Sequence, residues 1–171
     1  MVRSVQILII LLSFFGTAQK TNSIDFVIRN LGINVDGHFN TFQINTNFNA
    51  EGELVSIYGK IDVKSIKTGI DSRDEHLLEE DYFHENKFKH ITLKSTSIIK
   101  SSENNYRVSA ELSIKGKTKE IKIPVLVETI KNSKLITSSF EINRRDFDVG
   151  GSSFVMSKTV KIEVKQYQDL P

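Results

Sequence analysis

Residues 106–127 read YRVSAELSIKGKTKEIKIPVLV, and this stretch decides the fold class. Apolar residues occupy every second position from Tyr106 to Ile114, and the same period returns from Ile121 to Val127. A period of two is typical of a β-strand with one buried face. Lys115-Gly116-Lys117 separates the two runs, so the stretch predicts an antiparallel hairpin with a short turn.

The same alternation continues on both sides of this hairpin. It predicts eight strands, over residues 23–30, 42–48, 55–64, 91–100, 106–115, 119–130, 134–144 and 159–166. The segment Asn34-Val35-Asp36-Gly37 is rich in turn-forming residues and is expected to connect the first two strands. Short connections favour an all-β, antiparallel, up-and-down arrangement, either as a two-sheet sandwich or as a closed barrel without unpaired edges.

One segment breaks the two-residue period. Ser72-Arg73-Asp74-Glu75 has the form of a capping box, in which Ser is followed three positions later by Glu. We expect one short helix here, over residues 72–80 in a long connection, with Ser72 as its cap. The acidic residues of its first turn would also complement the helix dipole.

The first eighteen residues have the form of a secretory signal peptide. Arg3 precedes an apolar run from Val5 to Phe15, and the small residues Gly16 and Ala18 follow. This run is shorter than the about 20 residues that a membrane-spanning helix needs. We therefore expect cleavage near Ala18, a periplasmic or secreted location, and one domain over residues 19–171.

Composition and spacing exclude several classes of function. The formal charge is only +2, with Lys interleaved among Asp and Glu, so no nucleic-acid partner is expected. The chain contains no Cys, which removes disulfide and thiolate chemistry. His76 and His84 are not at the spacing that puts two His on one helical face. We expect neither a metal nor a cofactor.

Arg144-Arg145-Asp146 is a further charged cluster, at the end of a predicted strand. Adjacent residues on a strand point to opposite faces, so one arginine would face inward. We expect a structural salt bridge here rather than a site for an anion.

Short motifs occur in a fixed order along the chain. They are NLGINVDGHF at 30–39, SIKTG at 65–69, RDEHL at 73–77, DYF at 81–83, ITLKST at 91–96, LSIKGKTK at 112–119 and NRRDF at 143–147. In this order and spacing, the chain resembles the YceI-like family of exported polyisoprenoid-binding proteins from about residue 23 to residue 164. Two positions depart from the family pattern, since Asp148 replaces a usual Gly and His90 replaces a frequent Pro.

The resemblance implies an eight-stranded, lipocalin-like barrel that holds an isoprenoid-type lipid, of the quinone or polyprenol class, in its apolar interior. Without the resemblance, the inward-facing residues would be expected simply to fill a core. Arg73 and His76 are candidates for contact with a lipid head group at the barrel mouth. The inward-facing candidates for contact with the lipid are Phe26, Ile28, Phe42, Ile44, Ile57, Ile61, Leu93, Val108, Leu112, Ile123, Val125, Phe140 and Ile142.

Two other function classes remain as alternatives. An enzyme could use the same cavity for an apolar substrate, but no nucleophile motif such as Gly-x-Ser-x-Gly is present, so we expect no enzymatic activity. A transmembrane barrel would also alternate, but the helical segment and the absence of a terminal aromatic residue in Asp169-Leu170-Pro171 argue against stable membrane insertion. The oligomeric state stays open, with a homodimer as one alternative.

Overall fold

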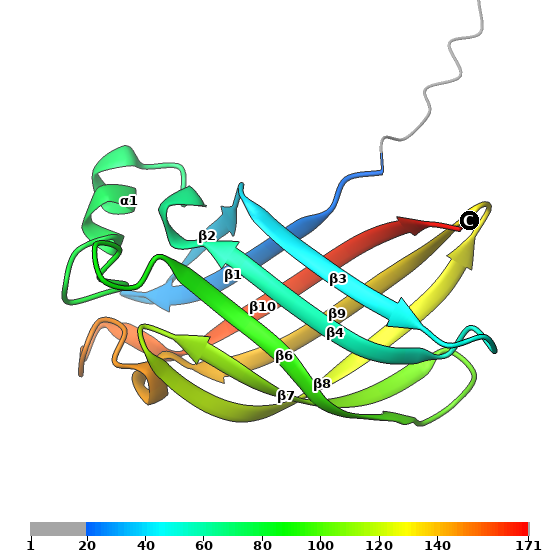
Figure 1. Ribbon diagram of the computed structural model, residues 1–171. Helices are drawn as coiled ribbons and strands as arrows, with labels where there is room; N and C mark the ends of the chain where they lie inside the picture. The colour runs from blue at the N-terminus through cyan, green and yellow to red at the C-terminus, as the bar shows by residue number, and fades with distance from the viewer. Residues whose placement is uncertain (1–19, 171) are drawn as a thin grey trace, which may run out of the picture.

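The computed structural model describes residues 20–170, which form one antiparallel sheet that curls on itself (Figure 1). The predicted signal peptide at residues 1–18 lies outside the described residues. In chain order the elements are β1 (Ser23–Asn30), β2 (Ile33–Phe39), β3 (Phe42–Phe48), β4 (Leu54–Asp62), the 3₁₀ turn η1 (Val63–Ser65), β5 (Ile66–Lys67), α1 (Asp71–Leu77), β6 (His90–Lys100), β7 (Asn105–Ile114), β8 (Lys117–Ile130), β9 (Ser133–Asn143), the 3₁₀ turn η2 (Arg144–Phe147) and β10 (Met156–Asp169).

Hydrogen-bonded neighbours follow the order β3-β4-β6-β7-β8-β9-β10-β1-β2-β5, which places β3 and β5 at the edges. β3 is nonetheless drawn toward β10 by side chains. The Thr46 hydroxyl donates to Gln168 Oε1 (2.5 Å), and Gln166 Nε2 donates to the Ile44 carbonyl (3.1 Å). Within residues 20–170, these side chains rather than a backbone ladder join the two strands. The all-β, barrel-like fold is confirmed.

The sheet contains the eight predicted strands and two more, β2 and β5. Residues 34–37, predicted as a turn, lie inside β2, and the chain turns instead at Leu31 and Gly32, whose φ angles are 51° and 79°. Gly37 serves packing rather than turning. A Cβ at this position would lie 2.2 Å from Cζ of Phe26, so only glycine leaves room for that ring.

The short helix is confirmed, but its predicted cap is wrong. α1 begins at Asp71, its N-cap is Ile70, and this cap makes no side-chain hydrogen bond. Asp74 instead accepts hydrogen bonds from the Thr68 amide (2.8 Å) and the Thr68 hydroxyl (2.6 Å). A buried contact to the preceding segment therefore fixes the start of the helix, and the local Ser-x-x-Glu pattern does not.

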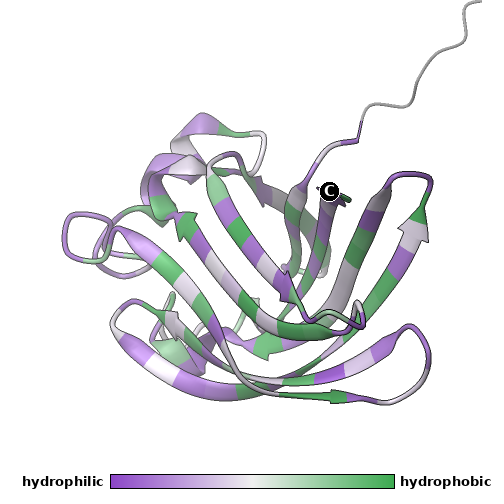
Figure 2. Ribbon diagram, turned by 45° about the vertical axis from the view of Figure 1, so that its right-hand side comes forward, coloured by the Kyte–Doolittle hydropathy of each residue, from purple (hydrophilic) through white to green (hydrophobic). Residues whose placement is uncertain are grey.

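Apolar and polar residues alternate along the strands, as Figure 2 shows in green and purple bands. On β7, Val108, Ala110, Leu112 and Ile114 are buried, whereas Glu111 is exposed. The buried side chains form two clusters, one around Phe147 near α1 and one around Val108. In the part of the chain that the structure describes, no helix has the length and apolar character to cross a membrane.

Candidate functional site

The curled sheet encloses a cavity of about 350 Å³. Every strand contributes to its wall, together with α1 and η2. The wall is predominantly apolar because residues at alternate positions face it, as Ile57, Gly59 and Ile61 do on β4. A volume of this size falls within the about 300–1,000 Å³ of small-molecule sites. The interior is therefore large enough to accept an apolar ligand.

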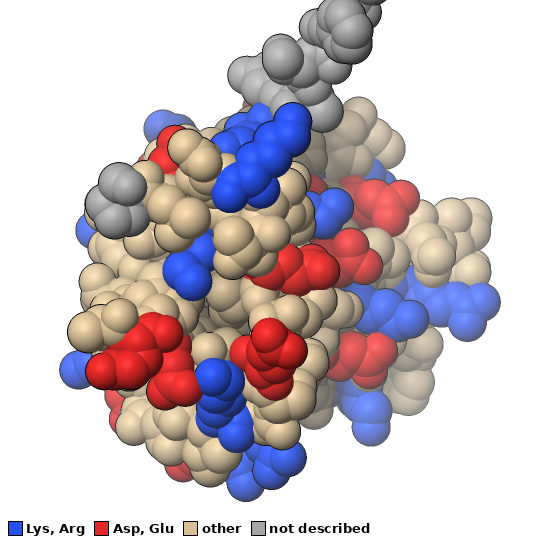
Figure 3. Space-filling view, turned by 90° about the vertical axis from the view of Figure 1, so that its right-hand side faces the viewer, with Lys and Arg blue, Asp and Glu red and all other residues tan. Residues whose placement is uncertain are grey.

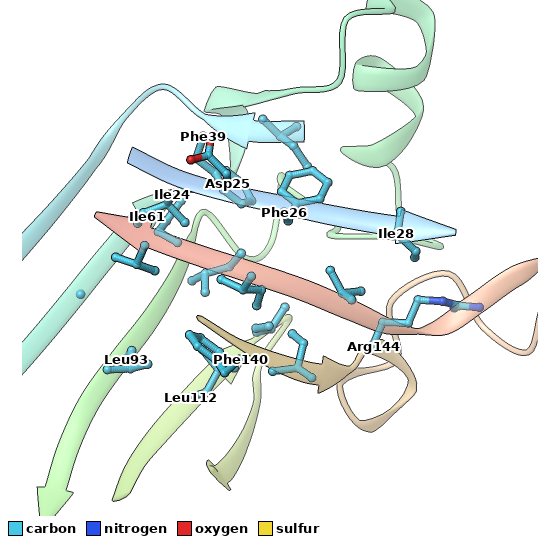
Figure 4. A pocket seen from close by; sticks show the side chains of 18 of the residues that line it. Ile24, Asp25, Phe26, Ile28, Phe39, Ile61, Leu93, Leu112, Phe140 and Arg144 are labelled. Atoms are coloured by element: carbon cyan, nitrogen blue, oxygen red, sulfur yellow. The ribbon is translucent and has the colours of Figure 1, made fainter. Parts of the chain in front are cut away.

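The structure places most of the candidate residues on this wall, and Figure 4 shows several of them from close by. Two do not line the cavity. Val108 is fully buried in the second cluster without reaching the cavity, although other members of that cluster line it, and Phe42 packs against the cluster near α1. Their contact with a ligand, like that of the others, stays a prediction. The candidates on the wall are Phe26, Ile28, Ile44, Ile57, Ile61, Leu93, Leu112, Ile123, Val125, Phe140 and Ile142, with Arg73 and His76 from α1.

Sequence reasoning missed a second part of the wall, on β10 and beside α1. Val160, Ile162 and Val164 line the cavity, and they carry the same two-residue period that identified β7. This signal was available in the sequence. Tyr82 and Phe83 also line the cavity, but they lie between α1 and β6, where no period indicates which side chains face inward.

Arg144 is the most deeply buried cation on the wall, with only 4% of its surface exposed. Its guanidinium donates to the carbonyls of Val149 (2.6 Å), Gly151 (2.8 Å), Met156 (3.2 Å) and Ser157 (2.8 Å). The salt bridge expected for this cluster is absent from residues 20–170, since neither Arg144 nor Arg145 pairs with a carboxylate there. Burial lowers the pKa of Arg144, and the neighbouring positive charge of Arg145 lowers it further.

The charged groups of α1 lock the helix to the sheet. Arg73 Nη2 donates to the Thr68 carbonyl (2.6 Å), and Lys67 Nζ lies 3.4 Å from Asp74 Oδ2. Burial raises the pKa of Asp74, but the Thr68 hydrogen bonds and Lys67 outweigh it and hold this pKa below its usual value. His76 Nδ1 lies 2.8 Å from Glu79 Oε2. These residues have structural partners, and Arg73 and His76 also reach the wall.

Asp148 explains one departure from the family pattern. Its φ is 54°, so it has the left-handed conformation that Gly adopts most readily and that Asp tolerates. Lys117 Nζ lies 2.5 Å from its carboxylate, and the Lys115 ammonium donates to its carbonyl (2.8 Å). The hydrogen bond from Lys117 lowers the pKa of Asp148. The loop keeps its turn without glycine at this position.

The wall offers little to acid–base or metal chemistry. Among residues 20–170, no three His, Cys, Asp or Glu residues are arranged to hold a metal ion. The carboxylates with lowered pKa values, such as Asp74 and Asp148, do not line the cavity. What the arrangement provides is a mainly apolar space with hydrogen-bonding groups near α1 and η2 and a few on the strands, among them Asp25, Thr46 and Gln166.

A single antiparallel sheet curled around such a space defines a small barrel-like fold with an internal apolar cavity. The model of the YceI-like domain matches residues 16–166, so this chain belongs to the YceI-like family. A UPF0312 protein of Vibrio parahaemolyticus is 28% identical over 154 residues, which cover 82% of this chain and 80% of that protein. The chain spans about half, 54%, of the length of the similar UPF0312 proteins of Vibrio cholerae, with 28% identity.

Solved structures show the same fold. Burkholderia cenocepacia BcnA superimposes with a TM-score of 0.80 at 22% identity, covering 85% of this chain and 95% of BcnA. A polyisoprenoid-binding domain from Saccharophagus degradans superimposes with a TM-score of 0.71 at 17% identity, covering 89% and 95% of the two chains.

Proposed function

We propose that this protein is exported and binds an isoprenoid-type lipid, of the quinone or polyprenol class, inside the curled sheet, and that it carries or sequesters this lipid. The apolar cavity of about 350 Å³ is the observation that supports the proposal most strongly. Burial of apolar surface is favourable by roughly 25 cal/mol per Å², so an alkyl chain can bind there with few polar contacts. The likeness to a polyisoprenoid-binding domain supports the same class of ligand.

The proposal assigns the protein no enzymatic activity. Catalysis on an apolar substrate would need a nucleophile or an acid–base pair that faces the cavity, with pKa values suited to the reaction. Among residues 20–170, Arg144 is the one wall residue whose pKa is shifted. Its N–H groups already donate hydrogen bonds to four carbonyls. A binding role uses the wall as it is.

Mass spectrometry of organic extracts from the purified protein tests the proposal. We expect a co-purifying lipid with a mass series spaced by isoprene units. The Leu112→Glu variant places a carboxylate on the apolar wall, where it must be desolvated or neutralised, and should lose this lipid. Glu111→Lys changes the neighbouring exposed position and should retain it. Circular dichroism shows whether both variants are folded before the extracts are compared.

Equal lipid content in the two folded variants would contradict binding inside the sheet. Export has a separate test, which is N-terminal sequencing of the protein recovered from its host. A start near residue 19 supports export. Recovery with Met1 intact would contradict cleavage of a signal peptide.

A further inference from the structure

Four large apolar side chains stand exposed together at the end of the molecule that carries α1. Leu31 lies in the β1–β2 turn and Ile33 is the first residue of β2, and they are 71% and 70% exposed. Phe154 and Val155 lie in the loop before β10, with Phe154 fully exposed. The Leu31 amide donates to the Val155 carbonyl (2.9 Å), so the turn and the loop are one unit. Both lie at the left of Figure 1, below α1. We call these four residues the apolar tip.

The turn and the loop that carry these exposed side chains have defined conformations. Leu31 has a φ of 51°, in a turn where Asn or Gly is the preferred residue, so its position costs conformational energy and packs no core. Arg144 fixes the loop on the other side through its four carbonyl contacts. An apolar side chain kept in solvent at a strained position indicates a surface that meets an apolar partner.

The two segments that carry the tip contain charges of one sign. Residues 29–34 and 149–158 contain Arg29 and Lys158 and no acidic residue. Arg145 joins them, because its Nη2 donates to the Ser153 carbonyl (2.8 Å) beside Phe154. All three cations are exposed, and none of them has an ion-pair partner within residues 20–170. A negatively charged surface would complement them.

The opposite end of the molecule carries charges of both signs. Acidic and basic side chains alternate around it (Figure 3), and Lys100 pairs there with Glu53 (2.7 Å) while Lys20 pairs with Asp169 (3.2 Å). Exposed aliphatic residues also occur elsewhere, as is usual on protein surfaces: Ile99 on β6 is 57% exposed, and Ile130 and Leu170 at the opposite end are about 40% exposed. The tip differs in combining four apolar side chains that are each more than half exposed with cations that have no ion-pair partner within residues 20–170.

We propose that the apolar tip docks on an anionic lipid surface, with its four apolar side chains in the interface and Arg29, Arg145 and Lys158 at the head groups. A stable protein interface uses about 20–30 residues on each side, far more than the tip offers, whereas amphipathic insertion needs only apolar side chains with flanking cations. Cavity-wall residues Asn30 and Met156 directly adjoin the tip in sequence. The inference deepens the proposed function, on which it rests, by naming where a membrane lipid would be exchanged.

Co-sedimentation with vesicles tests the tip, using residues 19–171, which contain the whole described fold and lack the apolar leader. Vesicles of equal parts phosphatidylcholine and phosphatidylglycerol should bind the protein, and phosphatidylcholine alone should bind it more weakly. Phe154→Ser should lower binding on the order of tenfold, and adding Leu31→Asn should lower it further. Neither change removes buried packing, and Asn suits the left-handed position. Ile99→Ser, at a single exposed site on β6, is the matched control and should bind like the parent.

A fluorescent farnesyl probe in vesicle-free solution separates this inference from the proposed function. The tip variants should bind the probe like the parent, since the tip lies outside the cavity. If Phe154→Ser and Ile99→Ser bind vesicles equally, or if the parent does not bind them, docking of the tip on lipid is contradicted. Neither result bears on binding of the probe in the cavity. Failure of the parent to bind the probe, with vesicle binding still dependent on Phe154, would overturn the proposed ligand and support the tip.

Discussion

Asp74 is a single buried carboxylate that decides where the helix stands. Its Oδ1 accepts two hydrogen bonds from Thr68, and its Oδ2 faces Lys67. Only 7% of its side chain is exposed, so the group must keep these partners when it is charged. The residue therefore couples the stability of the α1 segment to pH.

Asp74→Asn should lower the free energy of unfolding by about 1–3 kcal/mol at neutral pH, because it removes the charge that faces Lys67. The folded pKa of Asp74 is depressed, so its contribution is fully present above the unfolded pKa of about 3.9 and is lost as pH falls through the folded pKa. The difference in the free energy of unfolding between the parent and Asp74→Asn should thus become smaller below about pH 4. Urea unfolding across this range measures it.

Asp71→Asn is the control for this series. Its side chain is 94% exposed, although it also lies near Lys67 (3.6 Å), so its effect should stay within about 0.5 kcal/mol. If the loss of unfolding free energy in Asp74→Asn stays constant into the acid range, the charge of Asp74 does not contribute to stability.

Ser72→Ala tests whether Ser72 caps α1, as the local sequence pattern predicts, or does not, as the structure shows. If Ser72 were the cap, alanine would cost about 1 kcal/mol. Since the N-cap is Ile70 and Ser72 is exposed within the first turn, we expect a change within about 0.5 kcal/mol. Thermal unfolding decides between the two, and a clear loss of stability would restore Ser72 as the cap.

At the scale of elements, the loop between η2 and β10 depends on Arg144. Arg144→Met should cost about 2 kcal/mol or more, because four carbonyls lose a charged donor. Hydrogen exchange should also speed up across residues 148–157. Arg145→Met removes one exposed contact and should leave exchange in this loop nearly unchanged. The prediction fails if both variants exchange alike.

Elements with strong periodicity could be predicted, and those fixed by tertiary contacts could not. β7 and β8 follow from alternation alone, with their turn at Lys115 and Gly116 in left-handed conformations. β2 carries Asn34, Asp36 and Gly37, which locally favour a turn, yet pairing with β1 makes it a strand. β5 has only two residues and exists through its pairing with β2. Neighbouring strands, rather than local preference, determine both.

At the scale of the whole molecule, alternation predicts which side chains face inward. It does not predict whether those side chains pack against one another or line a cavity. Ile61 and Val108 carry the same signal, and only Ile61 lines the cavity, because the interior is filled around Val108. Whether a barrel is packed or hollow depends on the summed curvature of ten strands, which no single strand encodes. The position of the cavity therefore had to come from the structure.

Gly59 offers a test of the cavity that introduces no charge. It lines the wall between Ile57 and Ile61, and a Cβ there would meet only Leu93 Cβ, at an ordinary 3.8 Å. Gly59→Leu should therefore extend a side chain into the cavity and occupy space that a lipid chain would use. Each displaced CH₂ of a ligand is worth about 0.8 kcal/mol, so affinity for a prenyl probe should fall about tenfold or more.

Gly59→Leu should not lower the stability of the ligand-free protein, and this distinguishes a blocked site from a damaged fold. Filling an internal cavity commonly adds about 0.5–2 kcal/mol of stability, so the melting temperature of Gly59→Leu should equal or exceed that of the parent. Gly59→Ala adds a single methyl group and should have a correspondingly small effect on affinity. Calorimetry and probe titration on the three proteins give both quantities. A stable Gly59→Leu variant that binds the probe like the parent would place the lipid outside the curled sheet, since a leucine and a prenyl chain cannot occupy the same space.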